Sequence, residues 1–112
     1  MEQFIFPAVF YRDSEEDIFV VAFDDVNLFC NGKTVEECFI LAKKLLRDFV
    51  IVSYKLNGRV EERPRSYLES AKLHKGKIVL LICAEVNTGR IKIKDKATVI
   101  REALSGKIDD DE

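Results

Sequence analysis

The sequence contains little proline, glycine or cysteine, no tryptophan and a single histidine. With 2 prolines and 5 glycines among 112 residues, collagen-like and low-complexity chains are excluded. Its 3 cysteines include no Cys-x-x-Cys pair, which argues against a secreted disulfide framework and suits a reducing compartment. No apolar run approaches the roughly 20 residues that span a bilayer, and the first residues do not resemble a signal peptide. We therefore expect a cytoplasmic protein without a membrane segment.

Hydrophobic residues make up 47% of the chain and charged residues 34%, a balance typical of one folded domain of ordinary size. The formal net charge of −2 conceals an uneven distribution: residues 1–54 are acidic on balance, residues 55–108 are basic, and residues 109–112 are all acidic. A basic segment beside an acidic tail is compatible with a polyanionic partner. It is equally compatible with a solvated surface whose charges mask one another.

Few side chains are suited to catalysis or metal binding. His74 is the single histidine, which excludes a histidine cluster and an HExxH motif, and we expect it at the surface. The cysteines lack zinc-finger spacing, and no glycine-rich phosphate-binding motif occurs. The acidic pairs Asp24-Asp25 and Glu36-Glu37 suit loop and helix-start hydrogen bonds better than a metal ion. We therefore predict no catalysis, no cofactor and no metal.

The first half of the chain predicts three strands and one long helix. Residues 4–11, 18–23 and 28–30 are rich in β-branched and aromatic residues, and Pro7 favours a strand that begins or lies near a sheet edge. Thr34 and Glu37 match a capping box, after which apolar residues recur at helical spacing to Ser53 or Tyr54. A long amphipathic helix is therefore expected to start at Thr34.

The second half predicts shorter elements around one more strand. After a polar loop, Ser66 is placed to cap a short helix over residues 67–73. The apolar run 77–86 predicts a strand that is buried on both faces at the centre of the sheet. Residues 90–94 alternate with period two as a short strand, and the apolar residues of 97–104 predict a short helix that ends at Gly106.

Both faces of the first two strands are apolar, and this bears on function. A single long helix covers only one face of a sheet, so the second face needs another cover. The C-terminal segment, a second copy of the chain or a different protein could provide it, because an apolar sheet face of this size is rarely left in water. The pattern predicts self-association, as a homodimer or higher oligomer, or obligate binding to a partner.

Five cations of the C-terminal part form a candidate nucleic-acid site. They are Arg90, Lys92, Lys94, Lys96 and Arg101. If residues 90–94 form a strand, this spacing could follow phosphates as a β-ribbon does. The same lysines could instead protect an edge strand from aggregation, and no aromatic residue interleaves with them to stack on bases. DNA binding is therefore carried as an alternative function.

The order of these segments resembles the HicB family, the antitoxin half of HicA/HicB toxin–antitoxin pairs. The likeness spans about residues 4–86. Its motifs are the opening strand Phe6 to Asp13, a second strand ending at Phe23, the helix entry Gly32 to Cys38, Pro64-Arg65-Ser66 and the strand Ile78 to Ala84. The loop after Phe23 departs from the family pattern, since it lacks the family's two prolines and glycine.

The resemblance implies an α+β domain of β-β-β-α-β order, with an antiparallel-type sheet and one long helix, like a truncated ribonuclease H fold. Residues 1–86 would form this domain, and residues 87–112 a C-terminal extension with a short strand, a short helix and an acidic tail. The implied function is a non-catalytic antitoxin that binds a HicA-type mRNA-cleaving toxin and occludes its active site. Candidate contacts are Asp25, Leu28 and Phe29, with Phe29 as the anchor. A stand-alone oligomeric relative without a toxin is the other alternative.

Overall fold

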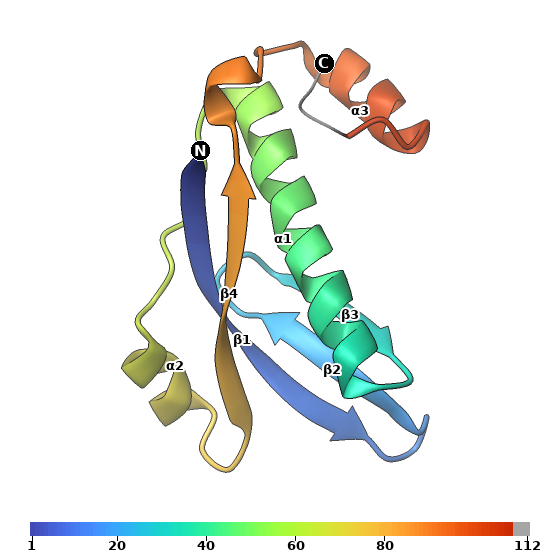
Figure 1. Cartoon of the computed structure of the whole chain (residues 1–112), viewed down its shortest axis with the longest axis vertical. Coiled ribbons are helices and arrows are strands. Elements are labelled where there is room, and N and C mark those ends of the chain that lie inside the picture. Colours follow the sequence, from blue (N-terminus) through green and yellow to red (C-terminus); the bar gives the residue numbers. More distant parts are fainter. Residues whose placement is uncertain (109–112) are drawn as a thin grey trace.

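The computed structural model describes residues 1–108 and forms a sheet of four strands with three α-helices (Figure 1). The predicted acidic tail lies outside the described residues. The elements follow one another as β1 (Glu2–Asp13), β2 (Ile18–Phe23), β3 (Leu28–Gly32), α1 (Val35–Asn57), α2 (Tyr67–Leu73), β4 (Ile78–Val86), the 3₁₀ turn η1 (Thr88–Arg90) and α3 (Lys96–Leu104). None of the described helices has the length and apolar character of a membrane span.

The strands lie in the order β3-β2-β1-β4, and every neighbouring pair is antiparallel. This confirms the α+β class with an antiparallel sheet. Two placements were wrong. The first strand, β1, is interior with partners on both sides, although Pro7 lies before the residues that pair with β2. Conversely, β4 is an edge strand that pairs on one side only. Some of its apolar side chains pack into the core, and the others are exposed.

Helix α1 crosses one face of the sheet and makes the core with it (Figure 1). Its N-terminus is fixed as expected at Thr34, whose hydroxyl accepts a hydrogen bond from the Glu37 backbone N–H at 3.0 Å. The Glu37 carboxylate, however, accepts from the backbone N–H of Lys33 rather than Thr34. The fully buried helix residues are Cys38, Ala42, Leu46, Val50 and Ile51.

The helix continues to Asn57, three residues beyond the predicted end. Gly58 stops it in the left-handed conformation, with φ 74°, and donates its backbone N–H to the carbonyl of Tyr54 at 2.8 Å. Lys55 in this last turn is buried and bonded to the C-terminal segment, which protects the end of the helix from fraying. Tertiary contact therefore extends the helix past the point where its apolar periodicity stops.

Helix α2 lies on the opposite side of the sheet from α1 (Figure 1). The cap predicted at Ser66 is confirmed and is a complete capping box: Ser66 accepts from the Glu69 backbone, and the Glu69 carboxylate accepts from the Ser66 backbone. The same bonds lower the pKa of Glu69. Because α2 packs against β4, it covers part of the sheet face that α1 leaves open.

The strand predicted over residues 90–94 is wrong. These residues follow the turn η1 without strand pairing, and the backbone N–H of Lys94 bonds to the Lys55 carbonyl at 2.8 Å instead. The helix that follows, α3, is confirmed, but Val99 is its buried residue while Ile100 and Leu104 are exposed. The C-terminal segment therefore packs against the end of α1 and does not cover the second face of the sheet.

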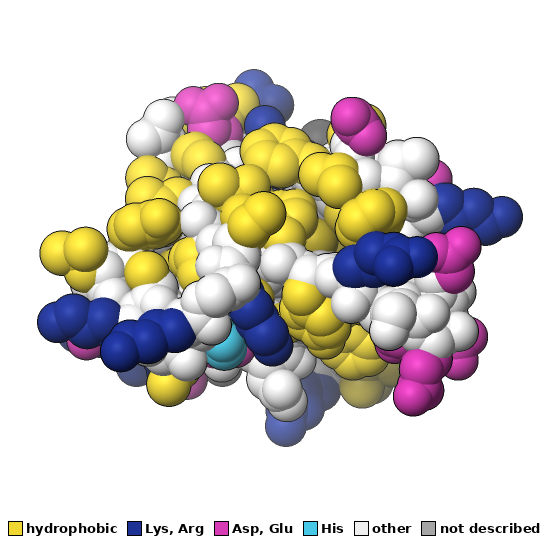
Figure 2. Space-filling model, turned by 90° about the horizontal axis from the view of Figure 1, so that it is seen from below, with side chains coloured by type: hydrophobic (Ala, Val, Ile, Leu, Met, Phe, Trp, Pro, Cys, Tyr) yellow, Lys and Arg dark blue, Asp and Glu magenta, His cyan; other side chains and the backbone are white. Residues whose placement is uncertain are grey.

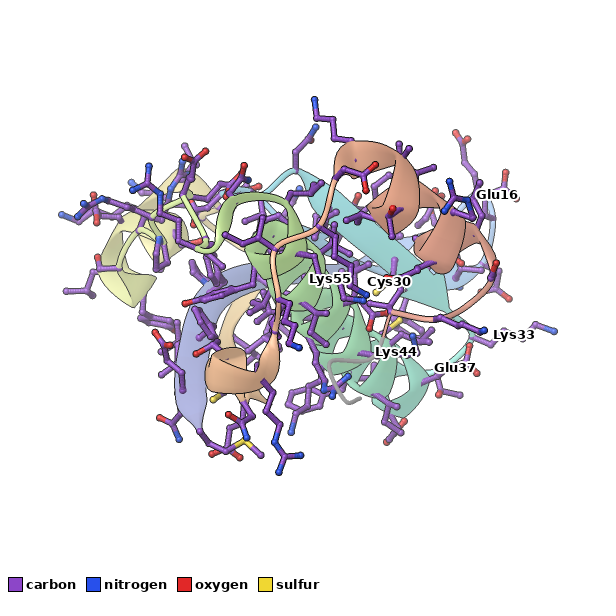
Figure 3. All side chains as sticks on the ribbon, turned by 90° about the horizontal axis from the view of Figure 1, so that it is seen from above. Glu16, Cys30, Lys33, Glu37, Lys44 and Lys55 are labelled. Atoms are coloured by element: carbon purple, nitrogen blue, oxygen red, sulfur yellow. The ribbon has the colours of Figure 1, made fainter. Side chains whose placement is uncertain are left out.

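A three-residue clasp joins this segment to α1: Glu102 accepts from Lys94 at 2.7 Å and from the buried Lys55 at 3.4 Å. Figure 3 looks onto this end of the molecule and labels Lys55. The hydrogen bond from Lys94 is the largest cause that lowers the pKa of the Glu102 carboxyl. The clasp holds α3 in place through charged groups rather than through a large apolar contact.

The lowered pKa of Glu102 makes the clasp sensitive to acid. We expect wild type to be more stable than Glu102→Gln at neutral pH, where the carboxylate is charged. Because the folded pKa lies below the ordinary value of 4.5, this advantage is lost as the pH falls from about 4.5 through the folded pKa. Thermal melts of both proteins across pH 3 to pH 7 measure it. A difference in melting temperature that does not shrink in acid would contradict the prediction.

Candidate protein-binding surfaces

The carboxylate of the predicted contact residue Asp25 is paired within the protein. The side chain is buried, with 6% of its surface exposed. One carboxylate oxygen binds Arg65 Nε at 2.8 Å, and the other accepts the Arg65 backbone N–H at 3.2 Å. Asp25 therefore links the loop that precedes α2 to the turn between β2 and β3.

The neighbouring Asp24 makes a second link of the same kind. Its carboxylate contacts His74 Nε2 at the C-terminal end of α2, so His74 is partly buried and engaged rather than a free surface residue. Both carboxylates of this acidic pair are thus used to hold α2 on the sheet. Within residues 1–108, no group of three or more potential metal-ligating residues comes together.

Asp25 is expected to contribute to stability. Replacing Asp25 with alanine leaves the partly buried Arg65 with only the more distant carboxylate of Asp24, at 4.0 Å, and should lower the free energy of unfolding by about 1–3 kcal/mol. Urea denaturation measures the change. The exposed pair Arg59–Glu61, whose charged atoms are 3.1 Å apart, supplies the control, because Glu61→Ala should cost at most about 1 kcal/mol. Equal losses for the two variants would contradict the structural role.

Phe29 is open to solvent, whereas Leu28 is half-buried against the core. Strand pairing explains the difference: Leu28 lies opposite Phe23 on the face under α1, while Phe29 lies opposite Ala22 on the other face. The side chain of Phe29 is 70% exposed, the highest value for any aromatic residue described. Of the three predicted contact residues, Phe29 is the exposed one, and Asp25 and Leu28 are partly buried.

The exposed apolar residues on this second face form a surface that we call the far-side surface. Its residues come from the strands and from α2, which covers part of the same face. The far-side surface consists of Ile5, Phe29, Tyr67, Leu68, Leu73 and Leu81. The sequence indicated that this face needs a cover but could not show that α2 adds its own exposed side chains to it.

The five candidate nucleic-acid contacts are spread over three kinds of structure. Arg90 ends η1, Lys92 and Lys94 lie in the irregular segment, and Lys96 and Arg101 belong to α3. Lys94 is already paired with Glu102. Since the strand that would align them is absent, the phosphate spacing of a β-ribbon is not formed, and the structure gives this function no further support.

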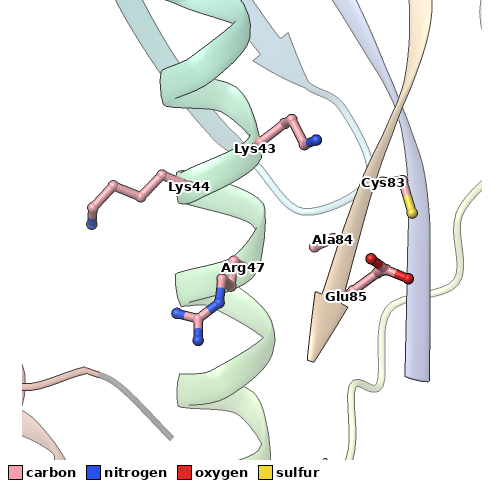
Figure 4. Close-up of a pocket in the computed structure, with 6 residues that line it drawn as sticks. All are labelled: Lys43, Lys44, Arg47, Cys83, Ala84 and Glu85. Carbon is pink, nitrogen blue, oxygen red and sulfur yellow. The ribbon is translucent and has the colours of Figure 1, made fainter. Parts of the chain in front are cut away.

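Two hollows lie beside β4, and no motif in the sequence predicts either of them. One, of about 340 Å³, is mainly apolar and includes Val35, Phe10, Ile78 and Leu80 in its walls. It opens at the end of the molecule shown in Figure 2, where hydrophobic side chains cover a broad area. The other, of about 380 Å³, lies between α1 and the C-terminal half of β4 (Figure 4).

The second hollow is lined by basic residues on α1 and by the edge of β4. Its α1 side carries Lys43, Lys44 and Arg47, and its strand side carries Cys83 to Glu85. Lys44 also pairs with Asp48 on its own helix at 2.7 Å. Cys30 and Cys38 lie elsewhere, at the covered face, where burial raises the pKa of both thiols.

This fold occurs in a toxin–antitoxin complex. A chain in a solved structure described as a toxin–antitoxin complex from Streptococcus pneumoniae superposes with a TM-score of 0.60. The match covers 95% of the present chain and 99% of the other, at 12% sequence identity. At that identity the likeness establishes a shared fold. No protein-family model matches the sequence, and no curated protein matches it significantly.

Proposed function

We propose that this protein is a HicB-like antitoxin, which binds a small HicA-type mRNA-cleaving toxin in the cytoplasm and occludes its active site. The observation that carries the proposal is the fold shared with a chain of a toxin–antitoxin complex, because the match extends over nearly the whole of both chains. The HicA and HicB assignment rests on the order of sequence motifs between residues 4 and 86. In this role the protein performs no catalysis of its own.

The far-side surface is the contact that we propose for the toxin. It offers large apolar side chains from three strands of the sheet and from α2, which is the composition that protein interfaces use at their centres. Phe29 suits the anchor position, since a solvent-exposed aromatic ring loses much water contact when it enters a pocket on a partner. The fastening of α2 by Asp24 and Asp25 keeps this surface rigid before binding, which lowers the entropic cost of association.

Affinity purification of the tagged protein from its native cells tests the function. We expect a stoichiometric small protein that arrests growth and degrades mRNA when expressed alone, and that co-expression of the present chain neutralises. Purified toxin should cleave RNA in vitro, and a molar excess of this protein should stop the cleavage. If the co-purifying protein is harmless alone, or if neutralisation does not require direct binding, the proposal is wrong.

A further inference from the structure

Four acidic side chains on and beside α2 are engaged within the protein. Asp24 and Asp25 hold the two ends of the helix through side-chain contacts, and Glu69 caps its first turn. On the neighbouring strand β4, Glu85 accepts a hydrogen bond from Gln3 at 3.2 Å. Because these carboxylates already have partners, they offer a binding protein little free negative charge.

Three lysines at the C-terminal end of α2 have no acidic partner, and we call Lys72, Lys75 and Lys77 the lysine cluster. Lys72 lies in the last turn of the helix, and the other two lie in the turn that leads into β4. All three are exposed, and none forms an ion pair within residues 1–108. No acidic residue occurs between Ser70 and Ala84 to offset them. Figure 2 shows dark-blue cationic side chains on both sides of the single histidine, which is drawn in cyan.

The lysine cluster lies on the same face of the sheet as Phe29, at the opposite edge. One row of paired residues crosses all four strands on this face: Phe29, Ala22, Val9 and Val79. Neighbouring strands are about 4.8 Å apart, so roughly 14 Å separates Phe29 from the β4 edge. Tyr11 shares this face, because it follows Val9 by two residues, and Lys77 Nζ lies 4.8 Å from the centroid of its ring.

The charge of this face therefore changes from one edge to the other. At the β3 edge, the far-face residues are Phe29 and Asn31, which carry no charge. At the β4 edge lies the lysine cluster. A site that cleaves mRNA has to attract phosphate groups, and in proteins this attraction comes from cationic side chains. Such a site repels the lysine cluster but not the β3 edge.

We infer that the far-side surface binds the toxin in one orientation, with Phe29 toward the catalytic site and the lysine cluster against an acidic patch of the toxin beside that site. The inference rests on the proposed function and on the far-side surface as the contact. The apolar side chains between the two edges supply the buried area. The lysine cluster steers the encounter and excludes the reversed orientation, because the reversed complex sets cations against cations.

Stopped-flow association with the co-purified toxin, at low and at high sodium chloride, tests the acidic patch. The double variant Lys72→Glu with Lys75→Glu should associate about tenfold or more slowly than wild type at low salt, and this difference should shrink at high salt. Lys92→Glu with Lys96→Glu is the control, because it makes the same change of net charge at exposed cations of the C-terminal segment. The control should associate at nearly the wild-type rate. Equal rates for the two double variants would overturn the inference.

Photo-cross-linking tests the orientation. A p-benzoylphenylalanine that replaces Lys75 should link to a toxin peptide rich in aspartate and glutamate. The same group in place of Phe29 should link close to the toxin residues whose substitution abolishes RNA cleavage. The reverse pattern would overturn the orientation. So would binding of a fluorescein-labelled single-stranded RNA by the free wild type that the Lys72 and Lys75 substitutions abolish, because the lysine cluster would then be a nucleic-acid site. Failure of wild type to neutralise the toxin refutes the proposed function instead.

Discussion

Replacing Phe29 with aspartate is expected to weaken toxin binding on the order of 100-fold, since anchor residues at interface centres contribute about 2–4 kcal/mol or more. The ring is exposed in the free protein, so its loss should change the free energy of unfolding by no more than about 0.5 kcal/mol. Isothermal titration with the purified toxin gives the binding constant, and a thermal melt of the free variant gives its stability. A large effect on binding with little on folding distinguishes a contact residue from a core residue.

The matched control for Phe29→Asp is Ile93→Asp. Ile93 is a similarly exposed apolar residue, but it lies in the segment between η1 and α3, away from the far-side surface. This variant should bind the toxin as wild type does. If both variants weaken binding equally, the effect is one of charge and not of the anchor. If Phe29→Asp binds normally, the far-side surface is not the toxin contact, although the antitoxin function itself would stand on the neutralisation test.

The largest loss of stability is expected for Leu46→Ala. Leu46 has no exposed surface and lies in the core where α1 crosses the sheet. Removing its isobutyl group costs both the burial of the side chain and the cavity that remains, so the free energy of unfolding should fall by about 2–5 kcal/mol. For a domain of this size that is a large share of a total stability of about 5–15 kcal/mol. Urea denaturation monitored by circular dichroism measures the change.

Leu104→Ala makes the same chemical change at an exposed position of a helix. Leu104 in α3 is 85% exposed, so its truncation removes little buried surface and should cost less than about 0.5 kcal/mol. The contrast between the two leucines isolates burial from helix propensity. Similar losses at both positions would show that α1 does not hold the core at Leu46.

The local signals in the sequence located the helices. Ser66 with Glu69 and Thr34 with Glu37 are hydrogen-bonding patterns that act within one turn, so residues three apart suffice to predict where α2 and α1 start. Gly106, in the left-handed conformation with φ 77°, likewise lies just beyond α3 as predicted. For these elements the determining contacts are close in sequence, and propensity and capping agree with the final fold.

Residues whose structural role depends on contacts far away in the sequence could not be predicted from such local signals. The run from Ile78 to Ala84 is apolar enough for a central strand, yet nothing local shows that it pairs on one side only. Asp25 finds its partner Arg65 forty residues later, so a residue that resembled an exposed contact is a buried brace. Residues 90–94 have the alternation of a strand but find no strand edge beside the end of α1. The exposure of Phe29, in contrast, follows from strand alternation once the register is known.

The pairing of β1 with β4 determines when the sheet can be completed during synthesis. Glu2 lies opposite Val86, so the strand made first acquires its second neighbour only after residue 86 has left the ribosome. Until then, one long side of β1 is unpaired and the apolar face beneath α1 is incomplete. Contacts so far apart in sequence make folding slow relative to helical bundles of similar length. A nascent chain is therefore unable to reach the native sheet until most of it has been translated, and it exposes β1 to aggregation throughout that interval.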